Sequence, residues 1–471
     1  MLSQGSRGAE VVARQEQLIA LGFLSGSADG EFGPATARAV RDAQRRLLLQ
    51  PDGLVGPRTS AALAAAVARQ PPAPTSLYRH FHREAQALAA SGEASLEKLP
   101  WLDRGLAASP FRDQPPRYAE RLARVLPAAQ LTPYPAPAGT FLPYPTRGVV
   151  PPIISGREGR GGLEFLSDAV AQACLCVGSF AADQPLRVRW YGRQALADNV
   201  QFWSATKFVA ALQLVCQANR RSPGTPIGIT RLQAGDGSSS QPFAPLFTAM
   251  VSYGQGVAAS NAIGLMLKQL RNNGEADVQT WLGNLSGNPR LSLCGGYGQP
   301  PFLADARLVG PAGVLVGNRP LTRNRNLVSA YDLVRSLTLL GWHPQLAPEA
   351  RLAGAQWASL ATLVEGLGHD TARYLDVALE RLGLLGAVSE PVILSKLGYG
   401  AETNDPQIDA FTYVAFASFR DIRTRPARQR CFALALRVPT APDLASALRD
   451  EARMATEITE IVRRVFAEEL G

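Results

Sequence analysis

The stretch WSATKFVAALQLVCQA, residues 203–218, places a serine three residues before a lysine at the start of a long apolar run. Only four of the 48 lysine and arginine residues are lysines: Lys98, Lys207, Lys268 and Lys396. Serine needs a base within hydrogen-bond reach to act as a nucleophile, and a buried lysine can lose its proton near neutral pH, whereas arginine cannot. The stretch therefore predicts a helix beginning at Ser204, with a nucleophile and its base on one face.

A second lysine supports this prediction. Lys396 lies in SKLG, at the end of a predicted strand and before a glycine-rich turn with an antiparallel return strand. A cation on a sheet edge beside the serine is the other amine that such a mechanism uses. The alternative is that S-x-x-K occurs here by chance and that Lys207 faces solvent.

The segments around these lysines predict an α+β domain with an antiparallel sheet. Residues 162–172 and 444–469 are predicted as helices, and the region between residues 204 and 390 is predicted as helical throughout. The predicted strands are 173–182, 186–193, 391–400, 410–419 and 431–438. Because the strands come from both ends of this region, the first and last segments must pair in one sheet.

The first 66 residues contain an internal repeat. DGEFGPATARAV at 29–40 recurs as DGLVGPRTSAAL at 52–63. Asp-Gly favours a tight turn, and proline at the first helical position has a fixed φ and no N–H to leave unpaired. Upstream, the apolar spacing predicts a helix that ends at Gly22. The repeat predicts two turns that each lead into a helix.

This stretch resembles the peptidoglycan-binding domain type 1 family, a compact three-helix module. The resemblance covers about residues 5–66 and implies a wall-targeting role without catalysis. It assigns the following residues to the peptidoglycan-binding module: Asp29, Gly30, Gly33, Asp52, Gly53 and Gly56. The alternative is that these residues only form turns, which leaves the duplication unexplained.

Residues 69–148 are rich in proline. They are predicted to form a connector with helical pieces between a module at 1–68 and a domain at 149–471. His80 and His82 lie on a predicted helix here, but an i, i+2 pair does not share a helix face. No metal site and no cofactor are therefore expected.

From about residue 150 to 471 the sequence resembles the serine β-lactamase and penicillin-binding-protein superfamily, closest to class A-like domains. A hairpin precedes S-x-x-K, and MVSYGQGVAASNAIG lies where the family has S-D-N. NLVSAYDLVRSLTLL resembles the family's T-A-R-D-L helix, and SKLGYG resembles its K-[TS]-G strand. The resemblance implies a small three-helix module joined to a sheet flanked by helices, with an all-helical subdomain.

Carried over residue by residue, the resemblance implies that Ser204 is the acyl-accepting nucleophile and Lys207 its base. Asn261 matches the asparagine of S-D-N and would bind the substrate amide. Lys396 and Gly398 match K-x-G. The oxyanion hole would use the backbone N–H of Ser204 and of a residue near Tyr399. The resemblance also implies that Leu397, Gly398 and Tyr399 contact the substrate.

Three departures from the family's pattern bear on this chemistry. Ala259 occupies the serine position of S-D-N, so the proton-shuttling hydroxyl is absent unless Ser260 replaces it. Leu397 replaces the Thr or Ser that helps to hold a substrate carboxylate, and no Glu-x-x-N occurs between residues 275 and 326. Because losing a proton-transfer group costs about 10²–10⁴ in rate, efficient β-lactam hydrolysis is not expected.

The net charge of +9 and the pI of about 9.6 suggest an anionic partner, such as nucleic acid, a membrane surface or a wall polymer. The arginines are scattered, however, which also fits a solvated cationic surface. Cys174 and Cys176 alternate within an apolar run and are predicted to point to one face of a buried strand; disulfides are not expected.

No apolar stretch reaches 18 residues, and no signal-peptide core occurs in residues 1–12. The two resemblances nevertheless imply a location in the cell envelope, in the periplasm or at the wall. We therefore expect either a leader upstream of this start or a non-standard export route.

The sequence leaves two main functions open. The first is a peptidoglycan-associated serine hydrolase that forms an acyl-enzyme on a wall-peptide amide or a related substrate. The second is a wall-binding scaffold with the same fold and degraded catalysis. An intracellular role as a nucleic-acid binder is a third alternative but is not expected. The substrate, the competence of deacylation and the oligomeric state are not predicted.

Overall fold

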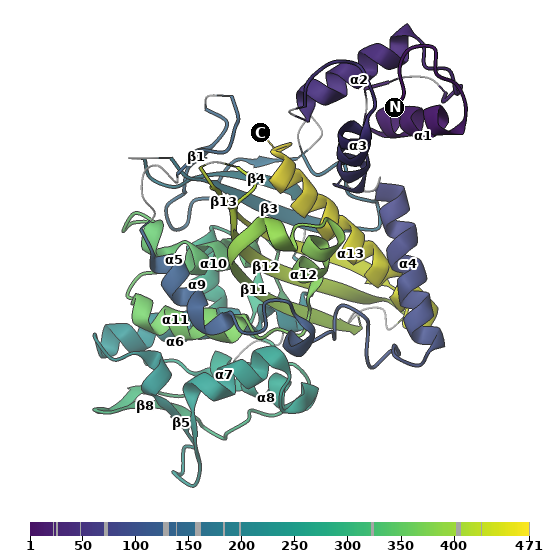
Figure 1. Ribbon diagram of the computed structural model, residues 1–471. Helices are drawn as coiled ribbons and strands as arrows, with labels where there is room; N and C mark the ends of the chain where they lie inside the picture. Colours follow the sequence, from purple (N-terminus) through teal and green to yellow (C-terminus); the bar gives the residue numbers. More distant parts are fainter. Residues whose placement is uncertain are drawn as a thin grey trace. The chain divides into compact units, whose positions relative to one another are not determined.

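The computed structural model describes residues 1–471 except 22, 25–26, 48, 70–73, 126–130, 138, 156–161, 182–183, 197–198, 322–324, 402–406, 425 and 471 (Figure 1). The chain forms two compact units, Met1–Ser76 and Leu77–Gly471. Each unit is described by itself.

The first unit contains three helices, α1 (Ala9–Ala20), α2 (Pro34–Arg46) and α3 (Pro57–Arg69). Their apolar faces enclose a small core that includes Val11, Leu18, Phe32, Val40 and Leu63. The predicted end of the first helix at Gly22 lies outside the described residues.

Each copy of the repeat folds around one buried glutamine. In the first copy, Gln15 Nε2 on α1 donates to Asp29 Oδ1 at 2.7 Å and to Thr36 Oγ1 at 3.1 Å, while the Gly30 N–H donates to Gln15 Oε1 at 2.8 Å. The second copy repeats the same contacts, at 2.7, 3.2 and 2.9 Å, among Gln44, Asp52, Gly53 and Thr59. The duplicated letters therefore encode a duplicated hydrogen-bond network.

The glycines of the repeat have two different structural tasks. Gly30 and Gly53 have φ of +74° and +77°, a region that residues with a Cβ rarely adopt. Gly33 is the N-cap of α2, directly before Pro34, and Gly56 directly precedes Pro57 of α3. Asp29, Gly30, Gly33 and their counterparts thus build the two turns.

The second unit is built on a seven-stranded sheet. Its strands are β1 (Leu142–Pro143), β2 (Ile153–Ile154), β3 (Gln172–Ser179), β4 (Arg187–Arg193), β11 (Val388–Ala401), β12 (Asp409–Asp421) and β13 (Arg428–Thr440). The order is β1-β4-β3-β13-β12-β11, with β2 pairing parallel to β4 and the other pairs antiparallel. The pairing of β3 with β13 confirms that the first and last segments meet, and it leaves β11 at the edge.

Helices cover both faces of the sheet. The helices of the second unit are α4 (Pro74–Ala90), α5 (Tyr118–Ala123), α6 (Lys207–Arg221), α7 (Phe243–Ser252), α8 (Gly256–Gln269), α9 (Val278–Ser286), α10 (Ala330–Gly341), α11 (Trp357–Leu367), α12 (Tyr374–Arg381) and α13 (Leu444–Ala467). Of these, α7, α8 and α9 pack mainly against other helices rather than on the sheet. Short 3-10 turns lie at Leu106–Ala108, Pro115–Arg117, Trp203–Thr206, Ile227–Ile229, His343–Gln345 and Leu385–Ala387.

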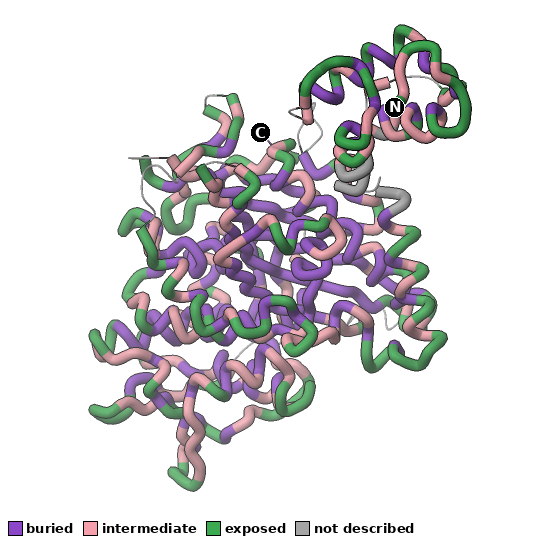
Figure 2. The backbone as a smooth tube through the Cα atoms, viewed as in Figure 1, coloured by how far each residue is buried: buried purple, intermediate pink, exposed green. Residues whose placement is uncertain are grey.

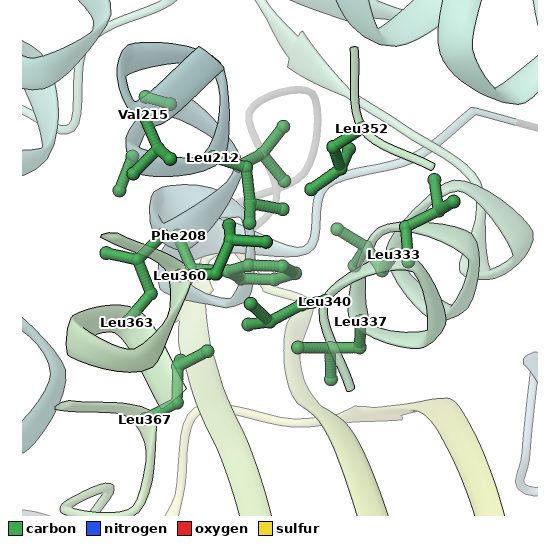
Figure 3. Packing of buried hydrophobic residues seen from close by; sticks show 14 of the residues in the cluster. Phe208, Leu212, Val215, Leu333, Leu337, Leu340, Leu352, Leu360, Leu363 and Leu367 are labelled. Atoms are coloured by element: carbon green, nitrogen blue, oxygen red, sulfur yellow. The ribbon is translucent and has the colours of Figure 1, made fainter. Parts of the chain in front are cut away.

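The side chains of the sheet alternate between two apolar cores, so its central strands are buried on both faces. These strands are coloured as buried in Figure 2. Cys174 and Cys176 point into the same core, as predicted, and all five cysteines are buried thiols. In that core, Phe208 and Leu212 of α6 pack among leucines of α10 and α11 (Figure 3). The opposite core contains side chains of α4, α12 and α13.

Three predictions of local structure were wrong, and two of them concern the segments that flank the β3–β4 hairpin. Residues 163–171 form turns rather than a helix. The Arg193 guanidinium donates hydrogen bonds to the carbonyl oxygens of Leu163, Leu166 and Ser167, which a helix would use for its own backbone hydrogen bonds. The serine of S-x-x-K lies in a 3-10 turn, and α6 begins only at Lys207.

The region predicted to be helical throughout also contains six short strands. They are β5 (Arg231–Gln233), β6 (Ser240–Pro242), β7 (Ser292–Leu293), β8 (Arg307–Gly310), β9 (Gly313–Val316) and β10 (Asn326–Leu327). They form a sheet of order β6-β5-β8-β9 and a β7–β10 pair. Strands of two to four residues are too short to show a periodicity in sequence.

Residues 77–123, part of the predicted connector, contribute side chains to the second unit. Phe81 of α4 packs edge-on against Trp101 at 5.0 Å between ring centroids, and Tyr118 of α5 is fully buried.

Among the described helices, none is long and apolar enough to span a membrane.

Candidate active site

The serine of S-x-x-K lies in a tight turn held against the edge strand. Trp203, directly before it, has φ of +42°, and strained backbone of this kind is often found at functional sites. A Cβ on Gly398 of β11 would lie 2.9 Å from the Ala205 nitrogen and 2.5 Å from Thr412 Oγ1. Glycine at the third position of K-x-G therefore allows the turn with Ser204 to approach β11.

Lys207 is fully buried at the start of α6. Its Nζ donates to Asn261 Oδ1 at 2.7 Å and to Ser260 Oγ at 2.9 Å, both on α8. Its aliphatic stem passes over Gly264, where a Cβ would lie 3.0 Å from Lys207 Cγ. Burial, followed by the neighbouring amines of Lys396 and Lys268, lowers the pKa of Lys207 to about 6. At neutral pH its amine is mostly unprotonated and can accept a proton.

A third lysine belongs to the same cluster. Lys268 Nζ donates to Asn326 Oδ1 at 2.7 Å and to the Gly295 carbonyl at 3.0 Å. The Tyr297 ring lies near both amines, with its centroid 4.2 Å from Lys268 Nζ and 5.1 Å from Lys207 Nζ. Burial lowers the pKa of Lys268 well below its usual value. Three of the four lysines thus gather around one site.

Lys396 reaches the site from the edge strand. Its Nζ donates to the Tyr253 hydroxyl at 2.9 Å and lies 3.5 Å from Asp370 Oδ1. Tyr253 ends α7 with φ of +54°, and Lys207 Nζ lies 5.5 Å from its ring centroid. Desolvation raises the pKa of the buried Asp370, against the opposing charge of Lys396. Tyr253 therefore stands between the two lysines that the sequence singled out.

A pocket of about 550 Å³ opens above these groups. Ser204 lines it, is only 8% exposed, and its Oγ has no hydrogen-bond partner among the described residues. The other lining residues are Leu96, Glu97, Leu99, Leu102, Asp103, Gln201, Trp203, Tyr253, Val257, Asn261, Gly296, Tyr297, Asn326, Thr371, Leu397 and Tyr399.

The predicted site residues fall at different depths around this pocket. Its lining includes the predicted Ser204, Asn261, Leu397 and Tyr399. The predicted lysines lie beneath it, and the Lys207 hydrogen bonds go to α8 rather than to Ser204. Ser260 does not line the pocket; its hydroxyl accepts from Lys207 and donates to the Met250 carbonyl at 2.7 Å.

Sequence reasoning gave no role to Tyr253, Lys268, Tyr297 and Asp103. The scarcity of lysine, which singled out Lys207 and Lys396, applies equally to Lys268. Tyr253 and Tyr297 stand beside glycines in irregular segments, which gives no periodic signal. Within the described ranges, no group of three or more His, Cys, Asp or Glu side chains converges as in a metal site.

Comparison with known proteins identifies the first unit. Residues 7–63 match the model of a family described as putative peptidoglycan binding domain. This segment is therefore similar to that family.

Two relatives match the same part of the chain. An N-acetylmuramoyl-L-alanine amidase, CwlL of Bacillus licheniformis, is 39% identical over 72 residues, which is 15% of this chain and 20% of the amidase. An uncharacterised protein of Kitasatospora aureofaciens is 45% identical over 64 residues, or 13% of this chain and 54% of that protein. The chain thus spans about a fifth of the amidase and about half of the second relative.

The rest of the chain is similar to class A-type β-lactamases of known structure. A β-lactamase from Xanthomonas campestris pv. campestris is 17% identical with a TM-score of 0.35, covering 63% of this chain and 92% of that one. A β-lactamase from Streptosporangium roseum is 12% identical with a TM-score of 0.35, covering 65% and 97%. Because these identities and TM-scores are low, the likeness does not assign an activity. The chemistry of the pocket is inferred from its own side chains.

Proposed function

We propose that the protein is a peptidoglycan-associated serine hydrolase that forms an acyl-enzyme on Ser204. The observation that carries this proposal is the buried amine of Lys207 near that serine. Its pKa of about 6 leaves a free base at neutral pH, and Asn261 and Ser260 hold it by hydrogen bonds of 2.7 and 2.9 Å. Keeping an unprotonated amine in a buried, oriented position is what activation of a serine requires.

In the proposed reaction, Lys207 accepts the Ser204 proton as Oγ attacks the substrate carbonyl. Backbone N–H groups of Ser204 and Tyr399 would bind the oxyanion, because the glycine at 398 lets the turn approach β11. The Asn261 amide nitrogen has no hydrogen-bond partner among the described residues and would bind the substrate amide.

Tyr253 is the proposed proton donor to the leaving group. Its hydroxyl accepts from Lys396 Nζ, and this hydrogen bond would stabilise the oxygen as the proton departs. Tyr253 would thereby transfer the proton that Ala259, without a hydroxyl, cannot transfer. The Ser260 hydroxyl is fully buried and does not line the pocket. Water would then attack the acyl carbonyl and give a proton to the Tyr253 phenolate, while Lys207 returns its proton to the departing Ser204 Oγ and the carboxylic acid is released. Lys207 must rotate from its hydrogen bonds with α8 to reach Ser204, and catalytic contacts are often looser in free enzymes.

The experiment is labelling of the full chain with a fluorescent penicillin and with a fluorophosphonate serine probe, followed by intact mass spectrometry. We expect one equivalent on the wild type and none on Ser204→Ala. Ser238→Ala, in an exposed turn, is the matched control and should label normally. Equal labelling of wild type and Ser204→Ala would contradict the proposal.

We further propose that the first unit retains the protein on peptidoglycan in the cell envelope. The match of residues 7–63 to the peptidoglycan-binding family supports this. Co-sedimentation with purified sacculi should persist at high salt, with no binding to DNA. Binding that disappears with salt, or binding to DNA, would instead indicate an anion-binding role of the +9 charge.

A second candidate is a wall-binding scaffold with the same fold and no turnover. The observation in its favour is that both Lys207 hydrogen bonds go to α8 while Ser204 Oγ has no partner among the described residues. Leu397 also supplies no hydroxyl to the pocket. Sacculus binding without any Ser204-dependent labelling would favour this candidate.

A further inference from the structure

One side of the pocket is formed by residues 95–105, a segment of the predicted connector. The Trp101 and Leu102 N–H groups both donate to Glu451 Oε1 of α13 at 2.8 Å. The Arg373 N–H donates to the Trp101 carbonyl, and the Gly105 N–H donates to the Thr371 carbonyl, each at 2.9 Å. These bonds attach the 95–105 segment to the second unit at several points, so it forms a fixed wall.

The side of this wall that lines the pocket is acidic, because Lys98 and Arg104 of the same segment do not line the pocket, and Arg104 pairs with Glu380 at 2.9 Å. Asp103 and Glu97 carry the only charges among the described residues that line the pocket, and the lining includes no arginine, lysine or histidine. Beneath the lining, Lys207 and Lys268 have lowered pKa values, and Lys396 faces Asp370 at 3.5 Å. A substrate carboxylate would therefore meet two acids, with no cation among the described lining residues to pair with it.

The remaining lining is apolar and aromatic. Leu397 and Val257 are among its apolar residues, and Trp203, Tyr253, Tyr297 and Tyr399 are its aromatic residues. Aromatic faces attract ammonium groups, and carboxylates at their rim add charge-assisted hydrogen bonds. Ser204, more than nine-tenths buried and without a described partner, shows where the reacting carbonyl would lie.

We propose that this pocket selects substrates that carry a protonated amine close to the bond attacked by Ser204, and that Asp103 and Glu97 are the residues that determine this specificity. The proposal rests on the proposed function, because it takes Ser204 as the reacting group. The ligand class is a peptide or ester with a diamino-acid residue next to the scissile bond.

The test compares three matched ligands that differ only in the end of one side chain. They are derivatives of N-acetyl-lysine, N-acetyl-norleucine and N-acetyl-2-aminoadipate, of one configuration, as amides for binding and as thiobenzyl esters for turnover. Binding of the amides to full-length Ser204→Ala tests the specificity without catalysis. Turnover of the esters by the wild type tests the proposed function.

We expect the lysine amide to bind about tenfold or more tightly than the norleucine amide, and the aminoadipate amide to bind most weakly. The double variant Glu97→Gln/Asp103→Asn, made in the Ser204→Ala background, should bring the three affinities together. Its asparagine keeps an oxygen to accept the Leu99 N–H, which Asp103 Oδ2 accepts at 2.9 Å. Asp113→Asn, at an exposed acid outside the pocket, should change nothing.

Equal binding of the three amides, binding of none, a preference for aminoadipate, or a preference that survives in the double variant would each overturn the specificity proposal. Absence of ester turnover together with tight, Asp103-dependent binding of the lysine amide would contradict the proposed hydrolase and support the proposed ligand class. Ester turnover without a lysine preference would support the proposed hydrolase and contradict the proposed ligand class.

Discussion

The two units bury polar side chains in different ways. In the first unit, Gln15 and Gln44 are each surrounded by partners that use both ends of the amide. In the second unit, Lys207 and Lys268 are buried amines whose pKa values burial has lowered, and Ser204 beside them has no described partner. Both arrangements match donors to acceptors, but the second holds two amines with lowered pKa values beneath a cavity and leaves the Ser204 hydroxyl without a described partner.

This difference separates a structural from a functional use of buried polarity. A satisfied network fixes a conformation, and removing one member leaves its partners unpaired at a cost of about 1–3 kcal/mol each. A perturbed titratable group costs stability to keep and is common at reactive sites. The repeat of the first unit is accordingly expected to matter for folding, and the lysine cluster for chemistry.

The largest effect is expected from Lys207→Met. Without its base, acylation of Ser204 should slow by about 10²–10⁴, measured as the rate of probe labelling. Thermal stability should change little, because removing the desolvated amine offsets the loss of its two hydrogen bonds: Ser260 keeps its bond to the Met250 carbonyl, and Asn261 lines the pocket, where water can reach it. Lys98→Met, at an exposed lysine, is the matched control. Strong destabilisation with normal labelling would mean that Lys207 has a structural use like that of Gln15.

Replacing the glutamines should have the opposite profile. Gln15→Leu or Gln44→Leu removes the partners of an aspartate, a threonine and a glycine N–H, so the first unit should lose about 2–4 kcal/mol. Hydrogen exchange of amides in residues 9–63, followed by mass spectrometry, measures this loss. Labelling of Ser204 should be unchanged. Gln50→Leu, at an exposed glutamine, is the control, and equal exchange in all three variants would refute the structural role.

The rate of Ser204 labelling should depend on pH through the Lys207 amine. Because the pKa of Lys207 is lowered to about 6, the free base is lost below that value. Labelling should fall about tenfold for each pH unit below 6 and should level off above it. A profile that is flat through pH 6, with the probe shown to be stable, would exclude Lys207 as the base.

Glu451 offers an intermediate case, since only one of its oxygens has partners. Oε1 accepts two N–H groups from the 95–105 segment, while Oε2 has no hydrogen-bond partner among the described residues. Burial raises its pKa from 4.5 to about 8, with Asp103 as a nearby charge of the same sign.

The folded state therefore holds this proton between pH 4.5 and 8 while the unfolded state does not. Stability should fall as the pH rises through that window, by up to about 1.4 kcal/mol for each unit. Glu451→Gln keeps an acceptor oxygen and should remove this part of the slope, as measured by urea unfolding at several pH values. An unchanged slope in Glu451→Gln would assign the effect to other groups.

The sequence predicted the parts of the fold whose signals are local. The duplicated D-G-x-x-G-P-x-T turns and the alternation of Cys174 and Cys176 follow from turn chemistry and from the period of a strand. Arg193 could not be foreseen as the partner of three carbonyl oxygens, because that contact depends on the tertiary fold. This contact is why a helix was wrongly predicted at 162–172.

For the candidate site, the sequence singled out Ser204, Lys207, Asn261 and Lys396, which the fold brings to one pocket or directly beneath it. It could not find Tyr253 or Asp103, because their position depends on a left-handed helix end and on a segment more than 100 residues before the serine. The rarity of lysine was the most informative signal, and it extends to Lys268.

The wall formed by residues 95–105 bears on how chains of this kind can be recombined. Phe81 and Trp101 share a core with α13, and Glu451 accepts two N–H groups from that wall. A recombination point at residue 149, with a different targeting module joined there, would remove one side of the pocket. It would also leave the buried Glu451 carboxyl without its two N–H donors. A recombination point before Leu77 would keep all the residues that line the pocket in one segment. The segment that can be exchanged as a whole is therefore Leu77–Gly471, which is longer than the sheet and its helices.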